Sequence, residues 1–189
     1  MTQDTFSEFV AECIAALPRD MKTVLRVVDE PDLGDEDRAK AAGLLLYILS
    51  GANALPGLKG VMAYVDDAFL LRLVLQQVRG ASPEALEAHI EAAPELFDDL
   101  DAHVDIIRSQ LGTGLFALLE KTASTLSGVT YRGHTAKGCA ASEDESTWLY
   151  DAVLEELTEK LDLDEDEVVR ESKTIHDIIE RTQLRTPGA

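Results

Sequence analysis

Two adjacent carboxylates lie at the start of the most hydrophobic stretch of this chain. Asp66 and Asp67 precede the apolar run AFLLRLVLQQV at 68–78, and a second apolar run, GLLLYIL, occupies 43–49. Each run is typical of a buried helix. Burying a carboxylate without a partner costs several kcal/mol. The fold must therefore provide partners for these two acids or leave them at the surface.

Apolar residues recur at helical spacing along most of the chain, and no alternating strand pattern competes with them. Hydrophobic residues make up 46% of the chain, aromatic residues only 5%, and the abundance of Ala and Leu favours helices over strands. We expect an all-α fold, a compact bundle of six to eight helices without a sheet. Residues 1–80 are expected to form a helical core. Residues 81–189 are expected to form an acidic helical half, packed with the first as one globular unit.

Acidic residues dominate the charge and are unevenly distributed. The chain has 36 acidic and 17 basic residues, a formal net charge of −19. Residues 80–107 contain eight acids and no Lys or Arg, and residues 142–189 contain 15 acids and five bases. A field of this sign repels nucleic acid and anionic membranes and attracts cationic partners. The charge pattern therefore indicates a basic partner protein and no nucleic acid.

The sequence shows no signal for export or for membrane insertion. Cys13 and Cys139 are far apart and no CxxC motif occurs, so we expect neither a disulfide nor a zinc site, and a reducing cytoplasm is the simpler setting. The N-terminal residues lack the basic and apolar regions of a signal peptide. The run 61–78 approaches the length of a membrane span, but it includes Asp66, Asp67 and Arg72, which are costly in a bilayer.

The segment SGANALPGLKGVMAYVDD at 50–67, with its flanking apolar helices, resembles the YkvA-like family, a bacterial domain of unknown function. The family core reads roughly S-P-x-D-x-x-P-D-x-x-P-x-x-G-x-x-D-D. This chain aligns with it without a gap over about residues 35–78 and keeps Ser50, Pro56, Asp66 and Asp67. Lys40 and Tyr47 fall where the family often has lysine and tyrosine. The chain departs from the family pattern at five positions, Gly51, Asn53, Gly57, Gly60 and Ala63.

The same residues suggest a structural role for the carboxylate pair. Adjacent side chains on a helix point about 100° apart, so Asp66 and Asp67 are not expected to face one apolar core together. We expect one to be exposed and the other to hydrogen-bond the loop around Asn53 and Pro56, which the pair would then order. The alternative is a functional pair that binds a metal ion or a cationic partner.

Residues 128–141, GVTYRGHTAKGCAA, have the composition of a loop, with few large apolar residues to anchor them. We expect a mobile loop in which trypsin cuts after Arg132 and Lys137. Arg132, His134 and Lys137 are also candidates for an anion site, because small residues and positive charge gather there.

No catalytic, metal-binding or cofactor-binding constellation is recognisable in the sequence. The residues three positions before the four histidines are not Glu, and neither HExxH nor a phosphate-binding loop occurs. We therefore expect a non-enzymatic, cytoplasmic interaction or regulatory protein, without cofactor or metal, whose acidic surface within 80–107 or 142–180 binds, masks, chaperones or inhibits a basic partner protein. Two alternatives stay open: peripheral membrane association through the apolar helix pair, and a small metal-dependent or other enzyme that uses Asp66 and Asp67. The sequence leaves the oligomeric state open.

Overall fold

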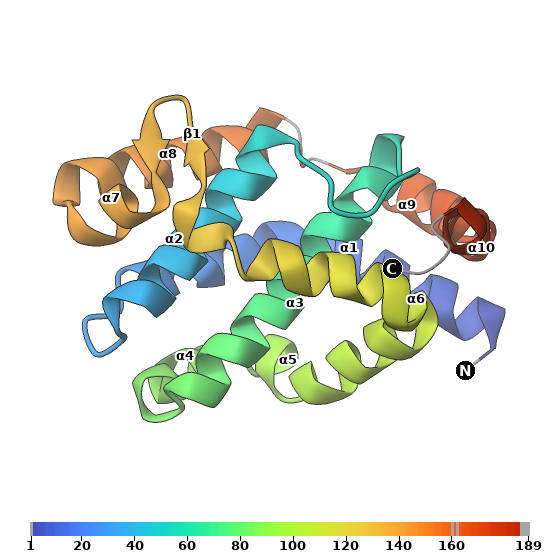
Figure 1. The fold of residues 1–189 in the computed structure, drawn as a ribbon, viewed down its shortest axis with the longest axis horizontal. Helices are drawn as coiled ribbons and strands as arrows, with labels where there is room; N and C mark the ends of the chain where they lie inside the picture. The colour runs from blue at the N-terminus through green and yellow to red at the C-terminus, as the bar shows by residue number, and fades with distance from the viewer. Residues whose placement is uncertain (1, 160, 162, 186–189) are drawn as a thin grey trace.

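Helices account for almost all regular structure in the computed structural model of this protein, which describes residues 2–159, 161 and 163–185 (Figure 1). The expected all-α class is confirmed, and within the described part of the chain six helices have 11 or more residues. In chain order the elements are α1 Gln3–Val28, α2 Asp35–Ser50, η1 Gly60–Ala63, α3 Tyr64–Ala81, η2 Glu84–Leu86, α4 Glu87–Ala92, α5 Pro94–Phe97, α6 Leu100–Ala123, η3 Leu126–Gly128, β1 Thr130–Tyr131, β2 His134–Thr135, α7 Ala136–Ala141, α8 Glu143–Glu159, α9 Glu165–Ser172 and α10 Ile175–Arg185.

Helix α3 lies at the centre of the bundle and is covered by other helices on several sides (Figure 1). It packs against α1, α2 and α6, and every residue from Val65 to Leu75 is buried. Residues of both chain halves, 1–80 and 81–189, contribute to one contiguous hydrophobic cluster. None of the helices in the described part is long and apolar enough to cross a bilayer.

A buried ion pair connects α1 to α3. Arg72 Nη2 lies 3.2 Å from Asp20 Oδ2, both side chains are buried, and Arg72 Nη1 donates to the Ala68 carbonyl at 3.0 Å. Burial raises the pKa of Asp20, and the Arg72 guanidinium opposes that rise. Such a pair is costly to break from one side, because the remaining charge is left buried.

Pro18 and Gly112 have different effects on the two longest helices. Pro18 lies inside α1 and does not end it; Leu17 and Met21 on either side of it are both fully buried, so the two halves of α1 belong to the same core. Gly112 adopts φ 67° and ψ 173° inside α6 and breaks its helical path. A positive φ of this kind favours glycine.

The expectation of an open loop at 128–141 is wrong. Thr130 pairs with Thr135 and Tyr131 with His134 in a short antiparallel hairpin, and α7 follows directly. The expectation of no sheet therefore fails for this two-stranded ribbon. Arg132 and Gly133 both have positive φ, 49° and 88°, the conformation of a tight hairpin turn. Three small residues anchor α7 by burial, Ala136, Cys139 and Ala140.

Helix α2 approaches the chain after α6 so closely that one position requires glycine. A Cβ atom on Gly43 would fall inside the van der Waals sphere of the Leu126 carbonyl oxygen in η3. The neighbouring Leu44 and Leu126 itself are fully buried. The backbones are thus in direct contact where α2 meets η3.

We predict that Gly43→Ala lowers the free energy of unfolding by about 2 kcal/mol or more, because the added methyl group forces η3 away from α2. Gly80 provides the matched control, since it lies in α3 and a Cβ atom added there would meet no other part of the protein within 4 Å. Gly80→Ala should leave stability unchanged or raise it by up to about 1 kcal/mol. Urea denaturation of both variants measures the difference, and equal effects would contradict the close contact.

Candidate functional site

Asp66 anchors the loop at 51–59 that joins α2 to η1 and α3. Its Oδ2 accepts hydrogen bonds from Tyr47 Oη at 2.7 Å and the Ala54 backbone N at 3.0 Å, and its Oδ1 accepts one from the Leu55 backbone N at 2.8 Å. The side chain is fully buried. Burial raises the pKa of Asp66, and the three donors oppose that rise. Asp66 thus has the loop-fixing geometry expected for one member of the pair.

Asp67 is not at the surface, and the expectation that one member of the pair is exposed is wrong. It is only 6% exposed, and its Oδ1 has no hydrogen-bond partner among the described residues. Burial, followed by the charges of Asp66 and of Glu156 on α8, raises the pKa of Asp67 to about 8. Asp67 is therefore mainly protonated and neutral at pH 7, which avoids the cost of a buried charge.

Asn53 and Pro56 lie at the surface, away from the carboxylate oxygens. Asn53 is exposed and donates from Nδ2 to the Gly51 carbonyl at 3.3 Å. Pro56 is exposed, and its carbonyl oxygen lies 3.1 Å from Thr182 Oγ1 of α10. Asp66 therefore holds the loop from within, while Asn53 and Pro56 lie on its exposed side. Among the described residues no group of three or more His, Cys, Asp or Glu side chains is arranged to hold a metal ion.

We predict opposite outcomes for the two carboxylates. Asp66→Asn should lower the free energy of unfolding by about 2 to 4 kcal/mol, because the amide cannot accept all three hydrogen bonds. Asp67→Asn should instead leave stability near neutral pH unchanged or raise it, because it replaces a protonated acid with a neutral side chain of the same shape. Chemical denaturation of both single variants tests this contrast.

The same pair gives a pH dependence with a defined sign. The pKa of Asp67 is raised from 3.8 to about 8 in the folded protein, so between these values the unfolded chain binds fewer protons than the native state. The contribution of Asp67 to the free energy of unfolding is then fully present below about pH 4 and is lost as the pH rises towards 8. The loss is at most about 1.4 kcal/mol per pH unit. Asp67→Asn should remove this fall. A parallel pH profile in both proteins would contradict the buried, protonated state.

Arg132, His134 and Lys137 have three different environments. Arg132 is exposed at the hairpin turn, with its guanidinium 5.1 Å from the Tyr131 ring centre, and Lys137 is exposed on α7. His134 points to α8, where its ring stacks on Trp148 with centres 3.5 Å apart and its Nδ1 lies 2.7 Å from Glu145 Oε2. Glu145 therefore already contacts one ring nitrogen of His134. The contacts of His134 with Glu145 and Trp148 join the hairpin to α8.

We predict that His134→Ala shifts the fluorescence emission of Trp148 to longer wavelength, because the ring loses its stacking partner and gains water. Trp148 is the one tryptophan in the sequence, so the tryptophan emission comes from this ring alone. Loss of the stack and of the Glu145 contact should cost about 1 to 2 kcal/mol of stability. Lys137→Ala, at an exposed position, is the control and should leave the emission unchanged; a shift in both variants would speak against the stack.

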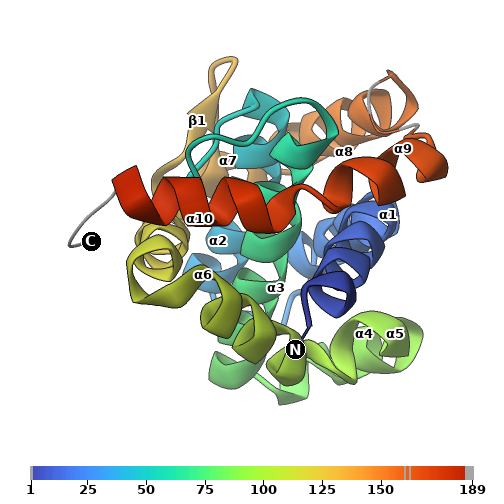
Figure 2. The same cartoon turned by 90° about the vertical axis from the view of Figure 1, so that its right-hand side faces the viewer.

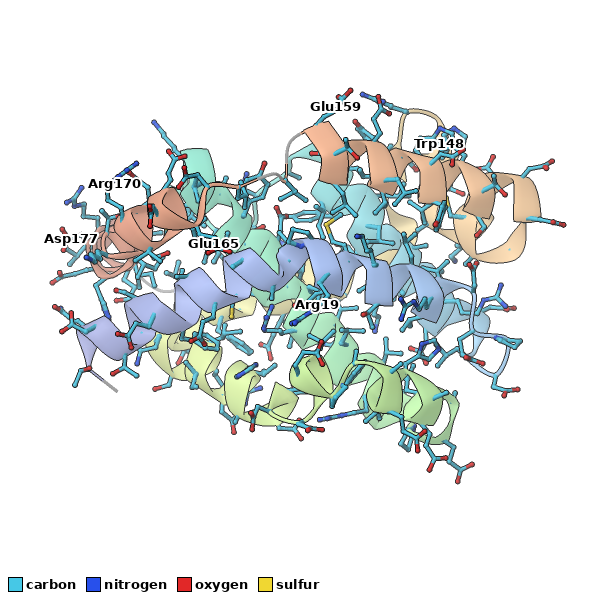
Figure 3. The ribbon with its side chains drawn as sticks, turned by 180° about the vertical axis from the view of Figure 1, so that it is seen from behind. Arg19, Trp148, Glu159, Glu165, Arg170 and Asp177 are labelled. Atoms are coloured by element: carbon cyan, nitrogen blue, oxygen red, sulfur yellow. The ribbon has the colours of Figure 1, made fainter. Side chains whose placement is uncertain are left out.

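A groove between α1 and α9 is the site that sequence reasoning missed. It is lined by four charged side chains with small or apolar residues between them: Asp4, Ser7, Glu8, Ala11, Glu12, Val169 and Lys173. Figure 3 shows α9, marked by Glu165 and Arg170, lying along the N-terminal half of α1. Only α9 belongs to the range 142–180 that the charge pattern singled out. The one available signal was the spacing of the three acids on α1, which places them on one face.

The three acids of α1 are not neutralised within the described part of the chain. Asp4, Glu8 and Glu12 are exposed and form no ion pair there. Like charges four residues apart on a helix repel each other. The lining also includes Ala11 of α1, which is buried, and Val169 of α9, which is 52% exposed. The groove thus combines a negative wall on α1 with an accessible apolar side chain on α9.

Comparison of the chain with protein-family models, with curated proteins and with solved structures finds no match. The resemblance of residues 35–78 to the YkvA-like family therefore stays a prediction, and the groove has to be interpreted from its own chemistry.

Proposed function

We propose that this protein is a non-enzymatic interaction protein that binds a basic segment of a partner protein in the groove between α1 and α9. The observation that carries the proposal is the row of three carboxylates, unpaired among the described residues, beside the exposed Val169. A segment with Lys or Arg on one side and an apolar residue between them complements both features. Charges of this kind mainly set the rate and specificity of association, and the apolar contact adds affinity.

The other acidic surface, within 80–107, is a weaker candidate because several of its acids already have basic neighbours. Glu95 pairs with Arg19 at 3.2 Å, and Asp101 pairs with Arg79 at 2.7 Å. Asp105 is close to Arg108 on the same helix. Intramolecular bases thus compensate this surface in part, whereas the acids of the groove are left for an external cation.

A cytoplasmic setting belongs to the same proposal. Cys13 and Cys139 are both free and buried, and burial raises the pKa of each thiol, to about 12 and about 11. Neither thiol is then a ready nucleophile or disulfide partner. Both features are those of a protein that works with reduced cysteines.

The test uses a fluorescently labelled peptide with Lys at every fourth position and Ala and Leu between, titrated with the full chain at low salt. Reversing Glu8 and Glu12 together to Lys should weaken binding about tenfold or more. Lys173→Gln should tighten binding about two- to fivefold, because it removes the one base that lines the groove. Added salt should weaken binding to the wild type.

The matched control reverses Glu91 and Glu120 together to Lys. Both are exposed and lie outside the groove, and the double reversal changes the net charge by the same amount as the groove variant. It should change the affinity much less. An equal loss in both double variants would show that only the overall field attracts the peptide, and absence of binding at low salt would refute the proposal.

A further inference from the structure

Helix α10 packs against α1 and α6 and over the 51–59 loop and the start of α3. In Figure 2 it crosses the front of the molecule between the loop that follows α2 and helix α6. Ile175 and Ile179 are buried there. The apolar residues beneath and beside it are Leu55, Leu58, Val65, Leu111 and Leu115.

Two side chains near the end of α10 attach to backbone carbonyls of other elements. Thr182 Oγ1 lies 3.1 Å from the Pro56 carbonyl oxygen and shares its one proton between that oxygen and the Ile178 carbonyl of α10, 2.7 Å away. Gln183 Nε2 donates to the Leu111 carbonyl at 2.9 Å. Leu111 directly precedes Gly112, where the path of α6 is broken. A Cβ on Gly57 would lie 3.2 Å from Thr182 Oγ1, so the loop also approaches α10 closely. The end of α10 is thereby joined both to the Asp66-anchored loop and to the kink of α6.

Helix α10 is joined to α9 by the short turn Lys173–Thr174. Lys173 lines the groove, as does Val169 of α9, so the seating of α10 positions one wall of the groove. The junction also contains two buried polar atoms without a hydrogen-bond partner in the described part of the chain, Ser172 Oγ and His176 Nε2. Unsatisfied buried polar atoms oppose the seated state. Specific contacts therefore hold α9 and α10 in place despite the free-energy cost of these two unpaired polar atoms.

We propose that α10 is a latch whose docking is positively coupled to occupation of the groove between α1 and α9. The inference rests on the proposed function, since it concerns the regulation of the same groove. Docked α10 holds α9 beside α1 and keeps the groove formed, and release of α10 lets α9 move away and weakens binding. By thermodynamic linkage, an occupied groove in turn stabilises the docked latch.

The test combines peptide titration with hydrogen exchange on the full chain, using the labelled Lys peptide described above. The unlatching variants are Gln183→Ala, which removes one hydrogen bond, and Ile179→Ala with Gln183→Ala, which also removes buried apolar contact. Leu184→Ala is the control, because Leu184 is on the same helix and 77% exposed. Circular dichroism establishes that each variant retains its helices.

We expect faster amide exchange over 175–185 in both unlatching variants, and peptide affinity about five- to tenfold weaker in the double variant, within the usual range of allosteric coupling. In the wild type, saturation with peptide should slow exchange over the same residues. Leu184→Ala should change neither quantity. The latch would be overturned if the variants exchange faster but bind the peptide with unchanged affinity, or if the peptide does not slow exchange in the wild type. The proposed binding groove would stand in both cases. Failure of the wild type to bind the peptide would instead overturn the proposed function, and the coupling with it, before any latch variant is compared.

Discussion

The burial of α3 is the constraint on which the rest of the structure depends. A helix that is enclosed by other helices leaves no aqueous side for its charged residues. Each of its three buried charged residues meets this constraint differently. Asp66 accepts three hydrogen bonds, Arg72 pairs with Asp20 and donates to a carbonyl, and Asp67 holds a proton at neutral pH because its pKa is raised to about 8.

The hydrogen bonds of Asp66 connect the centre of the protein to its surface. The donors to Asp66 are Tyr47 of α2 and two backbone amides of the 51–59 loop, so the carboxylate fixes where that loop runs. The loop in turn presents the Pro56 carbonyl to Thr182 of α10. The position of α10 thereby depends in part on a hydrogen-bond set inside the core, which gives Asp66 a structural effect far along the chain.

Sequence reasoning succeeded where the signal is local and failed where it depends on tertiary contacts. Helical spacing gave the all-α class, and two acids close to a Pro-Gly turn indicated that one of them contacts the loop. The 100° separation of adjacent side chains led to the wrong expectation that one of the two acids is exposed, because that argument assumes a helix with one buried side.

The prediction of a loop at 128–141 failed for a different reason. Its strands have two residues each, too few for an alternating pattern, and the small side chains of α7 show no apolar period. Those small side chains suit the dense packing of α7 against α2, in which Ala136 and Cys139 are buried. The groove was missed because its two walls, α1 and α9, are more than 130 residues apart in sequence.

The distribution of ion pairs separates the role of total charge from the role of the groove. A net charge of −19 opposes aggregation but weakens the compact state through self-repulsion. Ion pairs offset part of this repulsion on the surface formed by α5 and α6, where Arg19 and Arg79 meet Glu95 and Asp101. The acids on the outer face of α1 form no such ion pair within the described part of the chain, although Lys173 lines the same groove. A bound cation there would relieve repulsion as well as form new contacts, and a ligand that binds only the native state stabilises it. Partner binding and fold stability are then linked through the same carboxylates, and this linkage offers a physical reason for an unneutralised row of acids on a helix whose other side is fully packed.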